Sequence, residues 1–175
     1  ADMAVSAEDF GAAFIGSARA LLVSGTHFSQ PEIAGVCLRA IRQARRFVFD
    51  IDYRPVLWGL TSPGMGEQRF VASQHVTRKL QEVIPLAHLV IGTEEEFHIA
   101  GGCEDTDEAL RRLQKLSQAV FVVKRGPLGC TVHAGGAALR GEGFSVEVFN
   151  VLGAGDGFAA GFLSGWLRDL PLEEC

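Results

Sequence analysis

Helical and extended patterns alternate along almost the whole chain, and this alternation limits the possible folds more than any other feature. Short apolar runs typical of buried strands are followed by longer segments with apolar residues at helical spacing. Strands separated by helices usually run parallel and carry the helices on both faces of one sheet. The sequence therefore predicts an α/β protein with a mostly parallel sheet, in a single domain over residues 1–175.

The expected strands are short apolar runs bounded by turn residues. They are residues 20–24, 47–51, 88–91, 119–124, a hairpin of 130–134 with 137–139 around Gly135-Gly136, and 145–149. The expected helices cover about 6–19, 29–45, 73–83, 93–99, 106–116 and 157–167, and another begins near 171. A loop that includes residues 63–66 is expected before the third helix. Ser6-Ala-Glu-Asp9 and Ser29-Gln-Pro-Glu32 resemble capping boxes and predict two of the helix starts.

Charge and composition exclude several classes of function. A net charge of −5 argues against a nucleic-acid surface and against binding to an anionic membrane. Arg42, Arg45 and Arg46 form the only local basic cluster, which we interpret as a solvated helix end. No apolar run approaches the roughly 18 residues of a membrane span, and no signal-peptide pattern opens the chain. The four cysteines lack a C-x-x-C pair, so we expect free thiols in a reducing cytoplasm.

The segment Asn150-Val-Leu-Gly-Ala-Gly-Asp156 joins the last expected strand to an apolar helix. Gly153 and Gly155 let the backbone approach a ligand closely, and the positive end of the helix adds to the field of the turn. The amides of Ala154 to Asp156 therefore predict an anion hole. Asp156 beside it is suited to take a proton from a hydroxyl that attacks a phosphate.

This turn has two interpretations other than a phosphotransferase site. The first is an ordinary glycine-containing helix start with a capping Asp156, which is common among proteins. The second is a dinucleotide fingerprint, but Phe158 occupies its third glycine position and no second strand follows. The sequence favours phosphoryl transfer over the dinucleotide fingerprint. The ordinary helix start stays an alternative.

Polar residues also follow the second expected strand. Asp50, Asp52 and Arg54 stand at its carboxyl end, where ligands bind in open α/β sheets. Strand alternation predicts that Asp50 and Asp52 share one face, from which Arg54 reaches a phosphate with its planar donors. A local Asp–Arg ion pair that only orders the loop is the alternative. His27, after the first strand, is a further candidate at the border of the site.

The third and fourth strands end in charged turns. Thr93-Glu-Glu-Glu96 places three acids in a first helical turn, where the helix dipole alone favours them. Lys124-Arg-Gly-Pro-Leu-Gly129 contains a Gly-x-x-Gly turn that suits phosphates, with Lys124 as a source of charge. A plain β-turn is the alternative for this segment. The histidines share no ligand spacing, so a zinc site is not expected.

The Gly-Ala-Gly-Asp turn resembles the second signature of the ribokinase/PfkB family of carbohydrate kinases, whose usual form is Asp-Thr-x-Gly-Ala-Gly-Asp. This chain departs at Asn150 and Val151 and keeps the core. The segments described above follow in the family's order over about 150 of the 175 residues. The resemblance implies a ribokinase-like three-layer α/β/α fold. It also implies that the N-terminal lid part and the C-terminal end of the domain are missing.

The resemblance implies roles for the residues named above. In the family, an aspartate at the position of Asp156 is the base, and Gly153, Ala154 and Gly155 belong to the anion hole with Arg54 assisting. Thr93 replaces the Asn of an Asn-x-x-Glu motif, and Glu96 keeps the Glu that orients water around Mg²⁺, with Glu95 as the alternative. The implied nucleotide site takes in Lys124, Gly126, Gly129 and Thr93, and the substrate site takes in Asp52 and His27.

The implied activity is ATP-dependent phosphorylation of a sugar-acid hydroxyl, with Mg²⁺ and optionally a monovalent cation. Segment 50–58, Asp-Ile-Asp-Tyr-Arg-Pro-Val-Leu-Trp, is most similar to the branch of inositol catabolism that phosphorylates the 6-hydroxyl of 5-dehydro-2-deoxy-D-gluconate. Kinases of fructose, ribose or 2-keto-3-deoxygluconate and a non-catalytic nucleotide-binding fragment are the alternatives. The longer protein is a candidate homodimer, and we expect the piece without its lid to be poorly active because water enters its site.

Overall fold

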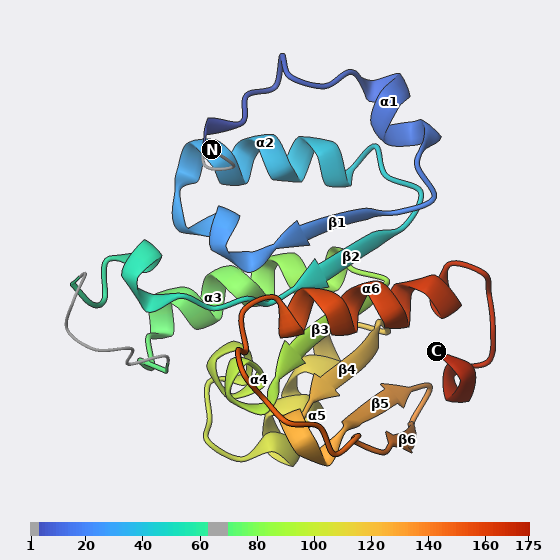
Figure 1. Ribbon diagram of the computed structural model, residues 1–175. Coiled ribbons are helices and arrows are strands. Elements are labelled where there is room, and N and C mark those ends of the chain that lie inside the picture. The colour runs from blue at the N-terminus through green and yellow to red at the C-terminus, as the bar shows by residue number, and fades with distance from the viewer. Residues whose placement is uncertain (1–3, 63–69) are drawn as a thin grey trace.

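The computed structural model describes residues 4–62 and 70–175, so the loop expected around 63–66 lies outside it. Four strands run parallel: β1 (Leu21–Ser24), β2 (Phe47–Asp50), β3 (Leu89–Thr93) and β4 (Val120–Lys124). The hairpin β5 (Cys130–Ala134) and β6 (Ala137–Gly141) adds two antiparallel strands at one edge. The six strands lie in chain order in one sheet, which confirms the predicted α/β class (Figure 1).

Alternation along the strands divides the core into two apolar layers. Phe47 and Phe49 of β2 point into the larger layer, whereas Val48 between them points into the smaller one. The larger layer is covered by helices α2 (Pro31–Ile41), α3 (Gln74–Val83), α4 (Glu94–Gly101) and α5 (Thr106–Leu116). Helix α6 (Ala154–Trp166) covers the smaller layer through Ala159 and Phe162 (Figure 1). Both faces of the sheet are therefore covered, and α6 lies opposite the other four helices.

The four parallel strands bring the segments that follow them to one edge of the sheet. A short 3-10 helix η2 (Gly25–Ser29) follows β1, and η3 (Pro55–Trp58) comes shortly after β2. Helix α4 starts directly after β3, and η5 (Gly126–Leu128) follows β4. The candidate residues from His27 to Gly129 lie in these segments, at the strand ends or in the loops beside them, so the fold gathers them at the carboxyl edge. Gly153 to Asp156 lie apart in the sequence, at the start of α6.

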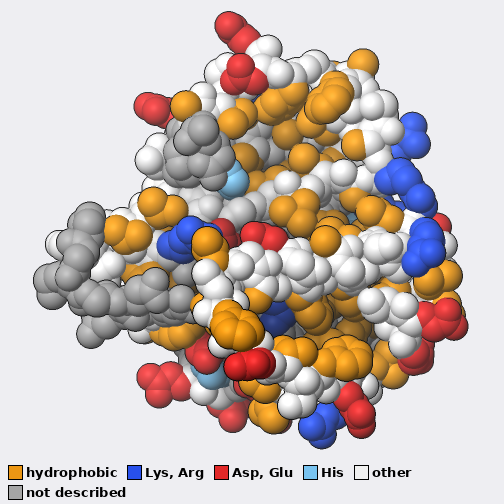
Figure 2. All heavy atoms as spheres, viewed as in Figure 1, with side chains coloured by type: hydrophobic (Ala, Val, Ile, Leu, Met, Phe, Trp, Pro, Cys, Tyr) orange, Lys and Arg blue, Asp and Glu red, His pale blue; other side chains and the backbone are white. Residues whose placement is uncertain are grey.

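The strand predicted at 145–149 is wrong, because this segment is irregular. Its apolar side chains are exposed, with Val146 at 71% and Phe149 at 89%, and Figure 2 shows apolar side chains on this face of the molecule. In the described part of the chain β6 ends the sheet, and no strand pairs with the segment. An alternating pattern does not form a strand without a partner for its hydrogen bonds.

Several predicted helix starts are also wrong. Ser6 to Asp9 forms a turn in which the Ser6 amide donates to Asp9 Oδ2 at 2.6 Å, but the helix α1 (Ala12–Ser17) starts only after an extended Gly11. Helix α2 is capped by Gln30 instead of Ser29, whose buried hydroxyl has no hydrogen-bond partner among the described residues. The capping box of the structure lies at the start of α4. Helix α2 ends at Ile41, and α6 begins earlier than predicted, at Ala154.

The hairpin predicted around Gly135-Gly136 is confirmed. Both glycines have positive φ, 56° and 83°, as a two-residue type I′ turn requires. At the C-terminus the expected helix is a single 3-10 turn, η6 (Leu172–Glu174). Within the ranges 4–62 and 70–175, no helix has the length and apolar character to cross a bilayer.

Candidate active site

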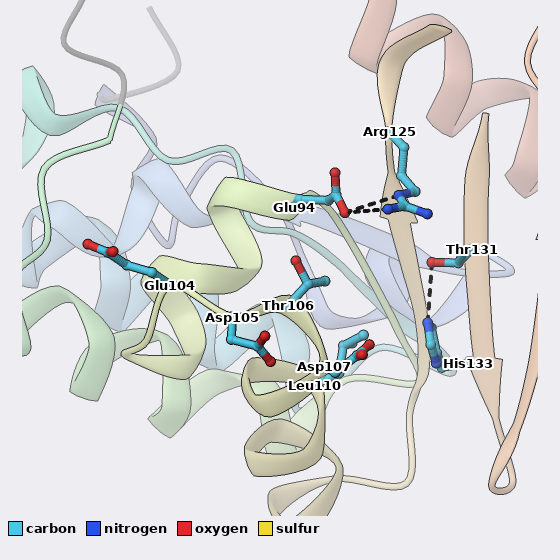
Figure 3. Close-up of a pocket in the computed structure, with 9 residues that line it drawn as sticks. All are labelled: Glu94, Glu104, Asp105, Thr106, Asp107, Leu110, Arg125, Thr131 and His133. Atoms are coloured by element: carbon cyan, nitrogen blue, oxygen red, sulfur yellow. Dashed lines mark hydrogen bonds and ion pairs between the residues drawn. The ribbon is translucent and has the colours of Figure 1, made fainter. Parts of the chain in front are cut away.

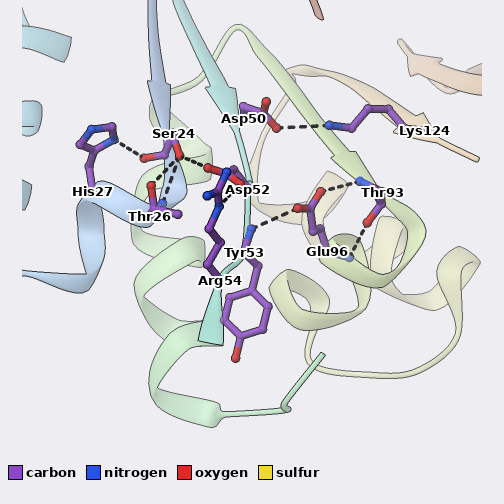
Figure 4. A network of polar contacts seen from close by, with 10 residues as sticks. All are labelled: Ser24, Thr26, His27, Asp50, Asp52, Tyr53, Arg54, Thr93, Glu96 and Lys124. Atoms are coloured by element: carbon purple, nitrogen blue, oxygen red, sulfur yellow. Dashed lines mark hydrogen bonds and ion pairs between the residues drawn. The ribbon is translucent and has the colours of Figure 1, made fainter. Parts of the chain in front are cut away.

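A polar network lies at the carboxyl edge of the sheet and links the ends of its four parallel strands (Figure 4). It contains Ser24 from β1, Asp50 and the following loop from β2, Thr93 and Glu96 at the start of α4, and Lys124 from β4. Candidates separated by about 100 positions in the sequence are therefore neighbours in space. Their individual contacts follow from where each strand ends.

The carboxylate of Asp52 bonds Ser24 at the end of β1 and Arg54 in the loop after β2. Its backbone has φ of 32°, because β2 ends at Asp50 and the chain turns there. Ser24 Oγ donates to Asp52 Oδ2 at 2.7 Å, and Arg54 Nε donates to Oδ1 at 3.1 Å. The prediction that strand alternation places Asp50 and Asp52 on one face is wrong, since the strand does not extend to Asp52. The local Asp–Arg ion pair considered for Arg54 is present.

Glu96 is buried and ties the β2 loop to the start of α4. Its Oε1 accepts a hydrogen bond from the Tyr53 amide at 3.1 Å, and its Oε2 accepts one from the Thr93 amide at 2.7 Å. Thr93 Oγ1 in turn accepts from the Glu96 amide, which completes a capping box. Glu95 is exposed, so Glu96 is the acid of this turn that lies in the network.

The fit of this site to Mg²⁺ depends on the oxygens that remain available. Each Glu96 oxygen accepts one bond from the backbone and keeps a second lone pair, which suits a water molecule of a hydrated Mg²⁺. In the described part of the chain, no group of three or more His, Cys, Asp or Glu side chains converges to hold a metal directly. The geometry fits a role for Glu96 through water.

Asp50 and Lys124 form a mostly buried ion pair. Their side chains are 12% and 14% exposed, and Lys124 Nζ lies 3.5 Å from Asp50 Oδ1. At this distance the contact is ionic, and Oδ1 accepts no hydrogen bond from the described residues. Burial raises the pKa of Asp50 to about 6, while the ammonium of Lys124 opposes the shift and the charges of Glu96 and Asp52 add to it.

Fewer backbone amides are available at the predicted anion hole than the sequence indicated. Gly153 caps α6 with a left-handed φ of 78°, and its carbonyl accepts from the Gly157 amide at 2.8 Å. The Ala154 amide donates to the Val151 carbonyl at 3.1 Å, so including it in the hole is wrong in this structure. The amides of Gly155 and Asp156 have no partner in the described part of the chain. The carboxylate of Asp156 is exposed beside them.

Lys124 joins the network to this turn. A Cβ placed on Gly155 would lie 3.4 Å from Lys124 Nζ, so the ammonium lies directly beneath the turn.

His27 stands at the other side of the network, where its Nδ1 bonds the Ser24 carbonyl at 3.0 Å (Figure 4). Sequence reasoning missed Ser24 as a partner of Asp52. Ser24 is the polar residue that ends the apolar run of the first strand, and this position could have indicated a site residue.

The Gly-x-x-Gly turn has a structural explanation. Gly129 has φ of 84°, and a Cβ there would overlap the Gly141 carbonyl oxygen of β6. Its amide donates to the Gly126 carbonyl at 3.0 Å, and its carbonyl accepts from the Arg125 amide at 2.8 Å. These bonds describe the tight turn given as the alternative. A nucleotide-binding role for Gly126 and Gly129 stays a prediction.

A polar hollow of about 330 Å³ lies elsewhere, against the start of α5 (Figure 3). Its lining includes Asp107, His133 and the ion pair of Arg125 Nη2 with Glu94 Oε1 at 2.9 Å. None of the predicted site residues lines it. The hollow is therefore separate from the network of Figure 4.

Comparison with known proteins identifies the family. The description "pfkB family carbohydrate kinase" matches residues 2–175. A 5-dehydro-2-deoxygluconokinase of Halalkalibacterium halodurans is 34% identical over 99% of this chain and 51% of its own length. The chain thus spans about half the length of the curated relatives it matches.

Solved structures agree with the fold. The adenosine kinase of Sinorhizobium meliloti superposes with a TM-score of 0.82 at 21% identity, over 99% of this chain and 50% of its own. A fructokinase of Vibrio cholerae O395, in a form with fructose, ADP and calcium bound, gives 0.73 at 22% identity, over 90% and 50%. The fold is ribokinase-like, as the resemblance implied. Since the family match extends over nearly every residue, the chain belongs to the pfkB family of carbohydrate kinases.

Proposed function

We propose that the protein to which this chain belongs transfers a phosphoryl group from ATP to a sugar-acid hydroxyl, with Asp156 as the base. The observation that carries this proposal is the start of α6. Two backbone amides, those of Gly155 and Asp156, are without partners in the described chain and stand at the positive end of a 13-residue helix. A carboxylate beside such a site disfavours simple anion storage and suits proton removal.

In the proposed reaction, Asp156 accepts the proton of the substrate hydroxyl as its oxygen attacks the γ-phosphorus of ATP. The new P–O bond forms while the bond to the leaving ADP oxygen breaks. The amides of Gly155 and Asp156 stabilise charge on the transferring group, and removal of one such donor typically lowers the rate by about 10² to 10³. Arg54 assists from the loop after β2. Catalysis then rests mainly on positioning and electrostatics.

Glu96 would hold the water shell of a Mg²⁺ ion, and Thr93 fixes Glu96 through the capping box. When bound, the ion would supply positive charge to the phosphate oxygens. ADP and a calcium ion occur in the fructokinase neighbour, which supports nucleotide and metal use in the family. A monovalent cation and a homodimer of the longer protein stay predictions, as do contacts of the substrate with Asp52 and His27.

The proposed substrate is 5-dehydro-2-deoxy-D-gluconate, phosphorylated at its 6-hydroxyl. The name of the H. halodurans relative supports this choice, as does segment 50–58. Fructose, ribose and 2-keto-3-deoxygluconate are the alternatives within the family. A non-catalytic nucleotide-binding role is the alternative of another class, and the exposure of Asp156 to water favours it for the 175-residue piece.

A competition assay with the full-length protein tests the proposal. Each candidate sugar is offered with ATP and Mg²⁺, singly and in mixtures, and the position of the phosphate is read by ³¹P NMR. We expect 5-dehydro-2-deoxygluconate to give the highest kcat/KM and a 6-phosphate. Preferred turnover of fructose would reassign the substrate, and a folded protein that binds ADP but phosphorylates no sugar would support the binding role.

A further inference from the structure

Lys124 lies on the same face of the sheet as helix α6. Along β4, Val122 points into the apolar layer beneath α6 and Val123 points into the opposite layer. Alternation therefore turns Lys124 toward α6. Along β2, Val48 points into the layer beneath α6, so Asp50 is directed to the same face. The two charged side chains meet there, at the carboxyl edge of the sheet (Figure 4).

The ammonium of Lys124 lies at the anion-binding turn. It lies 3.4 Å from the position that a Cβ would take at Gly155, which is van der Waals contact. The partnerless amides of Gly155 and Asp156 belong to the same turn. Three groups of positive character thus converge: two N–H groups and one ammonium.

The surroundings of Lys124 leave this positive charge under-satisfied. An ammonium has three donors, and in the described chain Lys124 makes only the 3.5 Å ion pair with Asp50. A helix start and an ammonium repel each other unless an anion lies between them. The carboxylates of Glu96 and Asp52 accept their hydrogen bonds from other groups and none from Lys124. The arrangement is suited to an added anion above Lys124.

We propose that Lys124 is a catalytic residue that contacts the transferring phosphoryl group at the turn, and that Asp50 is a positioning residue that holds its ammonium there. This inference rests on the proposed kinase function and deepens it. Lys124 exchanges no proton and stabilises the charge on the phosphoryl oxygens while one P–O bond forms and the other breaks. A lysine that only binds the nucleotide would affect KM, whereas a lysine at the transferring group affects kcat.

Kinetics of the full-length protein test the proposal. Lys124→Met removes the charge, Lys124→Arg restores it, and Lys115→Met is a control at an exposed lysine of α5. We expect Lys124→Met to lower kcat by about 10² or more with the KM for ATP within about threefold, as for loss of an oxyanion donor. We expect Arg to restore part of kcat, and Asp50→Asn to lower kcat by about tenfold with unchanged KM. An unchanged kcat in Lys124→Met, or a change in KM alone, would overturn the proposal.

A binding measurement separates this proposal from the kinase function. Beryllium fluoride with ADP mimics a bound phosphoryl group, and the rise in Tm beyond that given by ADP alone reports its site. We expect Lys124→Met to keep the rise with ADP and lose the increment from the fluoride. If the increment persists in Lys124→Met, the inference fails while the kinase function stands. If the wild type shows neither increment nor turnover, the kinase function fails and the inference with it.

Folding of the variants is checked by circular dichroism. Lys124→Met leaves the buried Asp50 without its counterion, so the double variant Asp50→Asn/Lys124→Met, which removes both charges, provides a second test. We expect the double variant to fold and to show the same loss of kcat and of the fluoride increment. A folded double variant with wild-type kcat would contradict the role of Lys124.

Discussion

Replacing Asp50 by Asn should remove a pH dependence of folding stability of about 2.4 kcal/mol between pH 4 and pH 7. Burial raises the pKa of Asp50 from an ordinary 3.8 to about 6 in the folded protein. One pKa unit corresponds to about 1.4 kcal/mol, so the whole difference between the folded and unfolded pKa is worth about 3 kcal/mol. About 2.4 kcal/mol of it is lost between pH 4 and pH 7, because the unfolded carboxyl is already partly ionised at pH 4. Its side chain is only 12% exposed, and solvent screening therefore reduces the effect little.

The sign follows from which state binds the proton more tightly. The folded protein holds the Asp50 proton up to about pH 6, whereas the unfolded chain releases it near 3.8. The contribution is therefore fully present below the unfolded pKa and is lost as pH rises through the folded pKa. Asn does not titrate, so the stability of the wild type relative to Asp50→Asn should fall by about 2.4 kcal/mol from pH 4 to pH 7.

Urea unfolding at pH 4, 5, 6 and 7, followed by circular dichroism, measures this difference. Other titrating groups are shared by the two proteins and cancel in it. Glu104→Gln is the control, because it removes an exposed acid on the loop before α5. A difference between wild type and Asp50→Asn that stays constant within about 0.5 kcal/mol, or that grows toward pH 7, would refute the reasoning.

Three further predictions concern packing and turns, and each is measured as a change in the free energy of urea unfolding. Glu96→Ala should destabilise by about 1–3 kcal/mol because the Tyr53 and Thr93 amides lose their acceptor, and a variant as stable as wild type would contradict the capping box. Gly129→Ala should destabilise by at least about 2 kcal/mol more than Gly135→Ala, since both have positive φ but only a Cβ at 129 overlaps backbone; equal losses would argue against this close approach. Leu113→Ala should destabilise by about 2–5 kcal/mol, because this side chain of α5 is fully buried in the larger layer; a loss under 1 kcal/mol would place it outside the core.

Much of the fold was predictable because its signals are local. The four parallel strands are uninterrupted apolar runs, and the hairpin follows from two adjacent glycines at a turn that needs positive φ at both positions. The strand expected at 145–149 has an equally good alternating pattern but pairs with no strand within 4–62 and 70–175. Pairing is a property of the sheet, and the pattern of one segment does not contain it.

The site was predictable in its members but not in their pairings. A polar residue at the end of an apolar strand indicated Asp50 and Lys124, because the carboxyl ends of parallel strands share one edge. Glu96 was indicated by the resemblance to the family's Asn-x-x-Glu motif. The ion pair of Asp50 with Lys124 depends on which faces of β2 and β4 meet α6, which requires the complete sheet. The Ala154 amide is unavailable for an anion because it donates a hydrogen bond to the Val151 carbonyl. This bond depends on backbone angles that the glycines permit but do not determine.

The central claim is that the turn before α6 carries phosphoryl transfer with Asp156 as its base. The most direct measurement is single-turnover transfer from γ-labelled ATP to 5-dehydro-2-deoxygluconate by the full-length protein and by Asp156→Asn, with ADP affinity measured in parallel. The account predicts that the rate falls by about 10² to 10⁴ in the variant while ADP binding stays within about threefold. A variant that transfers the phosphoryl group at the wild-type rate would contradict the account.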